Sequence, residues 1–185
     1  MRNIPIKIYL ICVLIIILIL GCDKSSEKIQ ILSKITSVDK NFSLEDFKNI
    51  GFKKSKDYNV KELPKATAVY YGFIKNNEGE PEDYEIRFYK NHNDAINYGE
   101  KYVANATGEE ACIEKDCALW KEDLKHRQKI SEPFLHMSGS AGNGIPIAKY
   151  LNYVIYGNFI LMCPGYDQEG ALLKCSAIVD KLNSN

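Results

Sequence analysis

The clearest pattern in this chain is an alternation of apolar and charged residues over positions 84–89. Tyrosine, isoleucine and phenylalanine occupy every second position, and Glu85 and Arg87 lie between them. A period of two is typical of a β-strand with one buried face. The run 68–74 is rich in valine, tyrosine and phenylalanine, and the polar stretch 76–81 between the two runs is typical of a turn. These residues predict two adjacent antiparallel strands.

After these strands the spacing of apolar residues changes to that of a helix. Small and apolar residues recur every three or four positions between Ala95 and Ala106. Asn91 or Asn93 can cap the start of this helix, and Gly108 is placed to end it. The pattern predicts one unit of strand, strand and helix.

The carboxy-terminal part of the chain repeats this order. Residues 150–156 and 159–163 predict two strands, and the Gly-Asn pair between them predicts a two-residue hairpin turn. Asp167 can cap a following helix whose apolar positions continue to Leu182. We interpret the repeat as a duplication of structure, because the residues of the two units show little similarity.

Two such units predict the fold class. We expect a four-stranded antiparallel sheet with both long helices on one face, which is a two-layer α+β sandwich. An insert from about residue 109 to 147 separates the two units. We expect this insert to carry a cysteine-bracketed loop and a helix over 118–128, with Asp116 as its cap.

The folded domain is expected to begin near Ser43. Ser43 and Asp46 resemble a capping box at the start of a short helix, which Gly51 is placed to end. Residues 53–63 are polar and are interpreted as a connection to the first strand. The sequence therefore predicts a single domain over residues 43–185.

The amino-terminal region has a different pattern, a short positive segment followed by an apolar run. Arg2 and Lys7 precede the almost unbroken apolar stretch 8–20, which is shorter than the about 20 residues of a membrane span. Its length suits the apolar region of a secretory signal, which has about 7–15 residues. The run closes with Ile-Leu-Gly-Cys at 19–22, which resembles the lipobox of bacterial lipoproteins.

The resemblance to the bacterial lipoprotein class implies that residues 1–21 are a signal peptide and that Cys22 carries a thioether-linked diacylglycerol. It also implies further acylation of the new amino terminus, by a fatty acid such as palmitate. Two or more acyl chains hold a protein firmly on its membrane. We therefore expect a lipid anchor on the extracytoplasmic face of the cell membrane, periplasmic or at the surface, with residues 22–42 as a flexible tether. The alternative is an uncleaved amino-terminal anchor in which Cys22 is incidental.

Charge and composition narrow the choice of partner. The chain has 24 basic and 24 acidic side chains, and Arg2 and Lys7 leave with the signal, so the mature chain is slightly acidic. No basic excess favours nucleic acid or attraction to anionic lipid. Hydrophobic residues make up 45% of the chain, with 12 tyrosines and 7 phenylalanines. This apolar content is sufficient for a packed core in a mature chain of roughly 160 residues.

Four cysteines remain for the folded domain, because Cys12 leaves with the signal and Cys22 takes the lipid. They are Cys112, Cys117, Cys163 and Cys175. An even number of cysteines in an exported protein indicates disulfides. Of the three possible pairings we expect the local one, Cys112 with Cys117 and Cys163 with Cys175. Buried free thiols and a metal or redox site are the alternatives, although neither spacing is the two-residue gap of zinc ribbons or thioredoxin-like centres.

The first and third predicted strands are apolar or aromatic on both sides. If the helices cover one face of the sheet, an aromatic surface remains on the other, and it would suit a ligand, a peptide or a partner protein. We predict Tyr71, Phe73, Arg87 and Tyr153 as residues of this possible binding face. The alternative is that the amino-terminal helix or the helix with Trp120 covers it.

No catalytic or cofactor motif stands out in the chain. The three histidines are isolated, with no second histidine at metal-ligand spacing, so neither a metal nor a cofactor is predicted. The serines of the glycine-rich stretch 138–144 lack the Gly-x-Ser-x-Gly elbow of hydrolases.

Two hypotheses on function follow. The leading one is a lipid-anchored extracytoplasmic module that binds a partner or ligand or supports an envelope complex, without chemistry of its own. The alternative is a membrane-tethered hydrolase or thiol-redox enzyme. In that alternative, polar groups such as His136, Arg87 and Glu85 would have to converge in one cleft.

Overall fold

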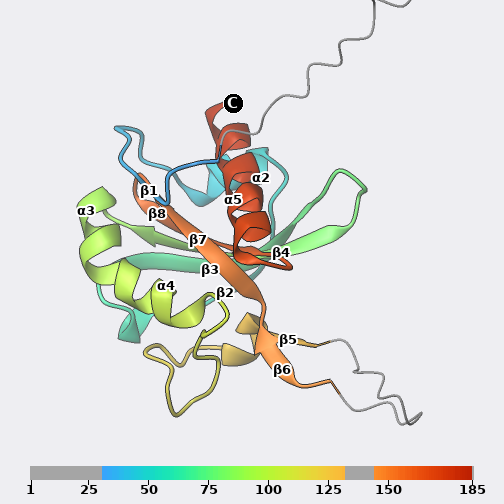
Figure 1. Ribbon diagram of the computed structural model, residues 1–185. Helices are drawn as coiled ribbons and strands as arrows, with labels where there is room; N and C mark the ends of the chain where they lie inside the picture. Colours follow the sequence, from blue (N-terminus) through green and yellow to red (C-terminus); the bar gives the residue numbers. More distant parts are fainter. Residues whose placement is uncertain (1–30, 132–143, 185) are drawn as a thin grey trace, which may run out of the picture.

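The described part of the protein is built on one mixed β-sheet. Within residues 31–131 and 144–184, which the computed structural model describes, six strands follow the order β1-β7-β8-β4-β3-β2, and β5 and β6 form a separate hairpin (Figure 1). The strands are β1 (Ile35–Thr36), β2 (Lys53–Asp57), β3 (Ala66–Lys75), β4 (Pro81–Tyr89), β5 (Gln128–Ile130), β6 (Pro146–Ala148), β7 (Tyr150–Tyr156) and β8 (Phe159–Pro164). The helical segments are α2 (Leu44–Asn49), η1 (Val60–Glu62), α3 (His92–Asp94), η2 (Ala95–Gly99), α4 (Glu100–Ala106), η3 (Leu124–Arg127) and α5 (Gln168–Asn183).

The middle of the sheet, β7-β8-β4-β3, is antiparallel, whereas β1 runs parallel to β7 at one edge. The four strands that the sequence predicts are present, with ends that differ by up to three residues. The turn between β7 and β8 places Gly157 at a φ of +53°, a left-handed conformation that glycine adopts without strain.

The predicted caps at Ser43, Asn91 and Asp167 are confirmed, whereas the helix that Asp116 was predicted to cap is absent from the described residues. The Ser43 N–H donates to the Asp46 carboxylate at 2.8 Å, which forms the capping box of α2. Asp167 accepts the Gly170 N–H at 2.6 Å and caps α5, and the Asn91 side chain caps α3. These caps satisfy N–H groups that have no partner within their helices.

One face of the sheet packs against α5 and α2. Cys175 and Val179 of α5 and Phe47 of α2 belong to one buried cluster with Ile86 of β4 and Leu161 of β8. All five side chains are fully buried. This face holds the larger core of the domain.

The opposite face is covered by α4, by the π-helical turn η2 and by the insert. Ala95 and Val103 pack on Ile160 and Met162 of β8, and Trp120 of the insert packs on Val69 of β3. Figure 1 shows α5 and α4 on either side of the diagonal strand β7. Both faces of the sheet are therefore buried.

The predicted fold class is wrong, because the sheet is mixed and six-stranded and its two long helices lie on opposite faces. The cause lies in the strands that are apolar on both sides, since each apolar face needs its own cover. The edge strands were not foreseen either. β2 is mostly lysine and has no apolar alternation, and β1 has only two residues.

The predicted helix over 118–128 is also wrong. This segment contains turns and a short 3₁₀-helix, η3, which leads into β5. Asp123 adopts a φ of +46°, which interrupts any continuous helix. Trp120 and Arg127 are both buried, with exposed fractions of 3% and 1%. Tertiary contacts of these two side chains override the local helical preference.

Residues 31–42, which the sequence assigns to the tether, end in structure. Ile35 and Thr36 pair with the last two residues of β7. Phe42 is buried, and its backbone N–H and C=O both bond to the side chain of Asn158. These contacts hold the described end of the amino-terminal segment against the domain.

Two disulfides have the predicted pairing. Cys112 is bonded to Cys117 and Cys163 to Cys175, with Cα–Cα distances of 5.6 and 5.7 Å. The second bond ties β8 to α5 inside the core. Two disulfides in one small domain indicate an oxidising, extracytoplasmic environment. In the part of the chain described by the structure, no helix combines the length and the apolarity needed to span a bilayer.

Candidate functional site

The four residues predicted as a binding face all point to the side of the sheet that α4 and the insert cover. Arg87 is fully buried and Tyr153 is 4% exposed, whereas Tyr71 and Phe73 are half-buried. An open aromatic face is therefore absent from the described residues, and the segment with Trp120 covers part of it, as the alternative held. A role of these four residues in binding stays a prediction.

Arg87 belongs to a charged cluster that we call the buried arginine network, made of Glu85, Arg87, Arg127 and Trp120. The two oxygens of the Glu85 carboxylate accept the Nε–H groups of Arg87 at 2.7 Å and of Arg127 at 2.8 Å. Both guanidinium carbons lie over the Trp120 ring, at 5.1 and 4.4 Å from its centroid. A flat guanidinium that stacks on a ring and donates through its Nε–H suits arginine and not lysine.

The network fixes the charge of Glu85. Burial alone would raise the pKa of this carboxyl, but the charges of Arg127 and Arg87 and their hydrogen bonds lower it below the usual value. Glu85 is therefore a permanent anion at neutral pH, and both of its oxygens are occupied. A carboxylate in this state holds its partners in place and is poorly suited to proton transfer.

A second polar cluster lies nearer the surface on the same face. The Lys149 Nζ is 2.6 Å from the Asp83 carboxylate, which also accepts the Tyr71 hydroxyl at 2.8 Å. The imidazole of His126 stacks on the Tyr71 ring, with centroids 4.7 Å apart. Asp83 and Tyr71 point to the covered face from neighbouring strands, and Lys149 lies between β6 and β7.

The ionisable groups of this outer cluster are held in their neutral or paired forms. Burial raises the pKa of Tyr71, and its hydrogen bond to Asp83 raises it further, so the phenol stays protonated. Burial also lowers the pKa of His126, and the nearby Lys56, Lys125 and Lys149 lower it further, against the opposite effect of Asp123. The cluster therefore presents a neutral imidazole beside a closed lysine–carboxylate pair at neutral pH.

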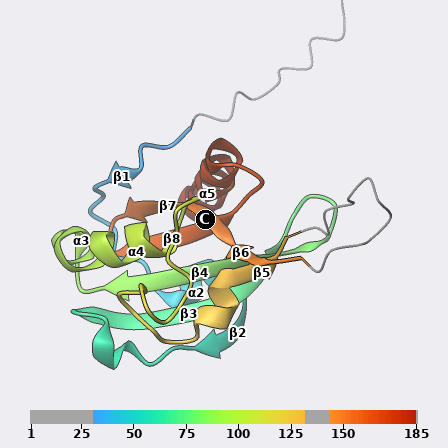
Figure 2. The ribbon, with the colours of Figure 1, turned by 60° about the horizontal axis from the view of Figure 1, so that its bottom comes forward.

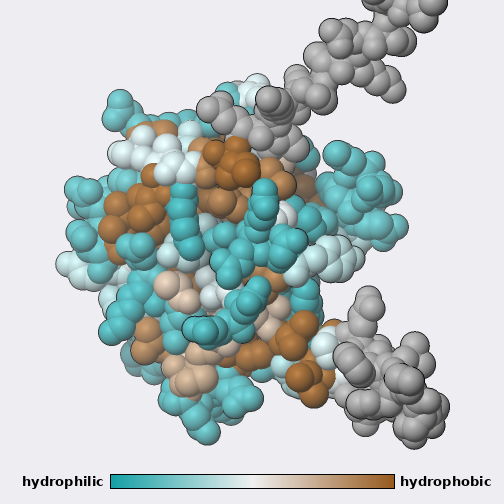
Figure 3. Space-filling model, viewed as in Figure 1, coloured by the Kyte–Doolittle hydropathy of each residue, from teal (hydrophilic) through white to brown (hydrophobic). Residues whose placement is uncertain are grey.

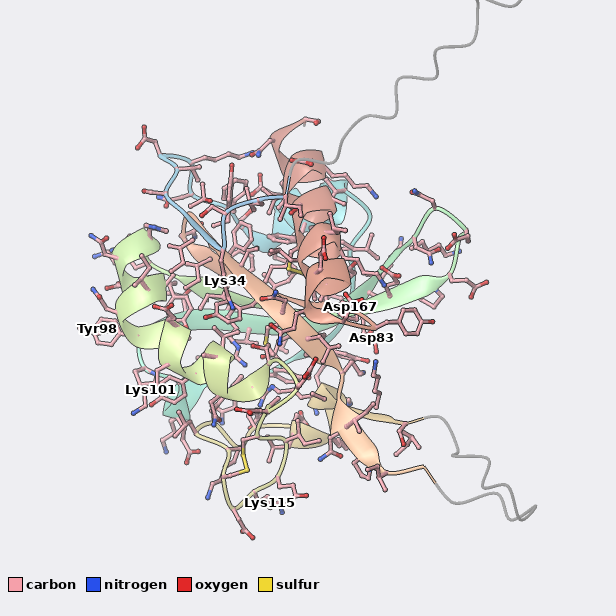
Figure 4. The ribbon with its side chains drawn as sticks, viewed as in Figure 1. Lys34, Asp83, Tyr98, Lys101, Lys115 and Asp167 are labelled. Carbon is pink, nitrogen blue, oxygen red and sulfur yellow. A yellow bond between two sulfur atoms is a disulfide. The ribbon has the colours of Figure 1, made fainter. Side chains whose placement is uncertain are left out.

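A separate surface cleft of about 390 Å³, which we call the β7 cleft, lies between α4, β7 and the start of α5. Lys34, Glu109, Glu110, Asn152 and Tyr153 are among the residues that line it. The Lys34 Nζ sits 4.1 Å from the centre of the Tyr153 ring, and Figure 4 shows Lys34 between α4 and β7. A volume in this range is typical of small-ligand sites.

The wall of the β7 cleft includes a sheet edge that lacks a strand partner among the described residues. β1 pairs only with Ile155 and Tyr156, so the first part of β7 is not covered by it. The register of β7 against β8 shifts at Leu151, which marks a β-bulge. Bulges at sheet edges often accompany binding and active sites.

Large apolar side chains are exposed on the hairpin. Ile130 and Ile145 are 66% and 65% exposed at the far ends of β5 and β6, and Figure 3 shows apolar surface there. Figure 2, in which the bottom of Figure 1 comes forward, shows the hairpin in front of the sheet. Both residues lead into positions 132–143, which lie outside the described residues together with His136 and most of the glycine-rich stretch. We assign no site to this surface.

A comparison with family models matches residues 43–184 to a family of unknown function, DUF6810. The chain belongs to this family. Neither a comparison with curated proteins nor one with solved structures finds a match. The DUF6810 region covers the whole sheet except β1, together with the buried arginine network.

The alternation of residues 84–89 predicts that Glu85 and Arg87 lie on one face of a strand, but the sequence did not indicate their partner Arg127. Arg127 lies 42 positions away in a segment interpreted as a helix. No local spacing points to Arg127, because its contact with Glu85 joins residues 42 positions apart. Within residues 31–131 and 144–184, no group of three or more histidine, cysteine, aspartate or glutamate side chains is placed to hold a metal ion.

Proposed function

We propose that the protein is a lipid-anchored, extracytoplasmic binding module whose ligand occupies the β7 cleft. The lipobox-like motif that ends at Cys22 supports the anchor, and the two disulfides support export. The observation that carries the proposal of binding is the cleft itself, a hollow of about 390 Å³ lined by charged and hydrogen-bonding side chains.

The lining of the cleft suggests the class of ligand. Lys34 supplies a positive charge from the segment before β1, and Glu109 and Glu110 supply negative charges from the segment after α4. Asn152 and Gln168 also line the cleft, and the Asn152 amide donates to the Gln168 carbonyl at 3.0 Å. A small zwitterion, such as an amino acid or a short peptide with free ends, could place its carboxylate near Lys34 and its ammonium near the glutamates.

The chemistry of the other polar groups supports binding over catalysis. Glu85 is held as a paired anion, and Tyr71 is held as a neutral phenol. The Cys163–Cys175 disulfide is fully buried, so a thiol cannot reach it while the domain is folded. These features suit a stable scaffold around a binding site.

The anchor is tested by replacing the lipidated residue. We expect the Cys22→Ser chain to leave the membrane fraction, whereas the wild-type chain needs detergent for release and resists high salt. Cys12→Ser is the matched control, because Cys12 lies in the same signal and leaves with it. A Cys22→Ser chain that stays membrane-bound and detergent-dependent would contradict the anchor.

The ligand class is tested by thermal unfolding of the mature Cys22→Ser chain with the common amino acids and a set of dipeptides. A ligand that binds the native state raises the unfolding temperature by mass action. We expect Lys34→Met and Glu109→Gln to abolish the shift. Lys115→Met should retain it, since Lys115 lies on the insert away from the cleft (Figure 4). No shift with any compound, or an equal shift in all variants, would contradict the assignment.

A further inference from the structure

The buried arginine network contains more positive than negative charge. Two guanidinium groups, of Arg87 and Arg127, share the single carboxylate of Glu85, and all three side chains are at most 1% exposed. Buried charges are normally paired, because their removal from water is costly. The network as it stands carries one uncompensated positive charge.

Nearby carboxylates are engaged elsewhere. Asp83 is bound to Lys149 in the outer cluster, and Asp123 forms an ion pair with Lys56 at the surface. Neither is hydrogen-bonded to an arginine of the network in the described residues. The excess charge is therefore not balanced by a second acidic side chain of 31–131 or 144–184.

The same network has hydrogen-bond donors without acceptors. Within the described residues, Nη1 and Nη2 of Arg87 and Nη2 of Arg127 are buried and have no hydrogen-bond partner. Arg127 uses its remaining Nη1 to donate to the Trp120 carbonyl at 3.2 Å. Unsatisfied buried donors are rare in folded proteins, so three of them in one cluster require a physical explanation.

These donors are confined to a small volume. Both Nε groups bind one carboxylate, and the two guanidinium carbons lie 5.1 and 4.4 Å from the centroid of one indole ring, so both side chains belong to one cluster. Three buried tyrosine hydroxyls on the covered side of the domain, those of Tyr58, Tyr89 and Tyr150, also have no partner among the described residues.

The tyrosine hydroxyls are neutral, so each has a proton that it can donate in a hydrogen bond. Burial raises the pKa of Tyr89 to about 12, although the nearby Arg87 charge acts in the opposite direction. Burial likewise raises the pKa of Tyr150 far above its ordinary value. Both phenols are therefore neutral and protonated at physiological pH, and each can donate a hydrogen bond.

We propose that the interior of the domain binds one small monovalent anion, of the halide class, at the free ends of Arg87 and Arg127. A single negative charge neutralises the excess of the network, and a halide accepts several hydrogen bonds from different directions. A water molecule could accept some of the N–H groups but would leave the charge uncompensated. A divalent oxyanion would reverse the imbalance and would need more space.

The position of the anion is tested by diffraction from crystals of the mature chain grown with bromide in place of chloride. We expect an anomalous peak within hydrogen-bonding distance of Nη atoms of Arg87 and Arg127. Water at this position without anomalous signal would overturn the proposal. Bromide found only at the protein surface would overturn it equally.

Affinity in solution is tested by thermal and chemical unfolding at constant ionic strength, with chloride exchanged for gluconate. For one native-state site above saturation, each tenfold rise in free chloride lowers the unfolding equilibrium constant tenfold. Arg87→Leu leaves Glu85 and Arg127 as a neutral pair, so we expect this dependence to vanish. Lys149→Met removes a cation outside the network and should keep it.

The two experiments decide the proposal together. A wild-type chain whose stability does not depend on chloride concentration overturns it, as does an Arg87→Leu chain that keeps the full dependence. If Arg87→Leu fails to fold, diffraction and chloride titration on the wild-type chain still give a decisive result.

Discussion

Replacing Glu85 with glutamine removes the negative charge of the buried arginine network and keeps the shape of the side chain. The carboxylate accepts two charge-assisted hydrogen bonds, at 2.7 and 2.8 Å, from side chains that are at most 1% exposed. Breaking a buried ion pair by removing one partner costs about 3–5 kcal/mol, because a charge is left without compensation. We expect Glu85→Gln to lower the free energy of unfolding by this amount, which is a large part of the about 5–15 kcal/mol of a typical domain.

Asp83→Asn is the matched control for this substitution. Asp83 lies two positions away on the same strand and face, and its carboxylate pairs with Lys149 at 2.6 Å. Its side chain is 35% exposed, so solvent screens the pair, and we expect a cost of about 0–1 kcal/mol. Urea unfolding at pH 7 with the disulfides intact gives both values from the midpoints and slopes. Equal costs for the two variants would refute the reasoning.

The cost of Glu85→Gln in free energy of unfolding depends on pH. Burial would raise the pKa of Glu85, but Arg127 and Arg87 lower it, so the carboxylate stabilises the fold at any pH above its unfolded pKa of about 4.3. This contribution is lost as the pH falls through the lower, folded pKa. The difference between the wild type and Glu85→Gln should therefore shrink on acidification below about pH 4. A difference that stays constant down to pH 3 would contradict the sign of the shift.

Three further substitutions test single parts of the fold by urea unfolding. The double variant Cys163→Ala/Cys175→Ala opens a loop with a sequence separation of 12 and should cost about 3 kcal/mol. Asp167→Ala removes the 2.6 Å cap of α5 and should cost about 1 kcal/mol. Gly99→Ala places a methyl group 2.6 Å from the Tyr89 hydroxyl and should cost about 1–3 kcal/mol. Unchanged unfolding midpoints would contradict the corresponding contact.

The central hairpins could be predicted from the sequence because their signals are local. β4 alternates between apolar and charged residues, and β7 and β8 are joined by a two-residue turn. The caps at Ser43 and Asp167 depend on neighbouring residues as well. Elements of this kind are encoded within about ten residues and do not need knowledge of distant contacts.

The arrangement of these elements could not be predicted in the same way. β2 is a lysine-rich edge strand that pairs with β3, and β1 is two residues long. Ala95 of η2 and Val103 of α4 pack on the face of the sheet opposite α5. The local sequence does not indicate which face of the sheet these residues contact. The number of strands and the side of each helix are set by long-range packing, which periodicity does not report.

The candidate site was partly visible in the sequence. Glu85 and Arg87 were expected on one side of a strand. Arg127 comes from the insert and donates to the same Glu85 carboxylate, a contact that the sequence did not indicate. The β7 cleft brings together Lys34, Glu109 and Tyr153 from three distant segments. No spacing rule joins residues so far apart, so only the folded structure could bring them together.

The most direct test of the lipid-anchored module is the intact mass of the protein taken from native membranes, with thiol alkylation before and after reduction. The account predicts a chain that begins at Cys22, carries the mass of at least two acyl chains, and has four thiols that react only after reduction. A chain that retains residues 1–21, or one that begins at Cys22 without acyl mass, would contradict the anchor. Thiols that react before reduction would contradict the disulfides.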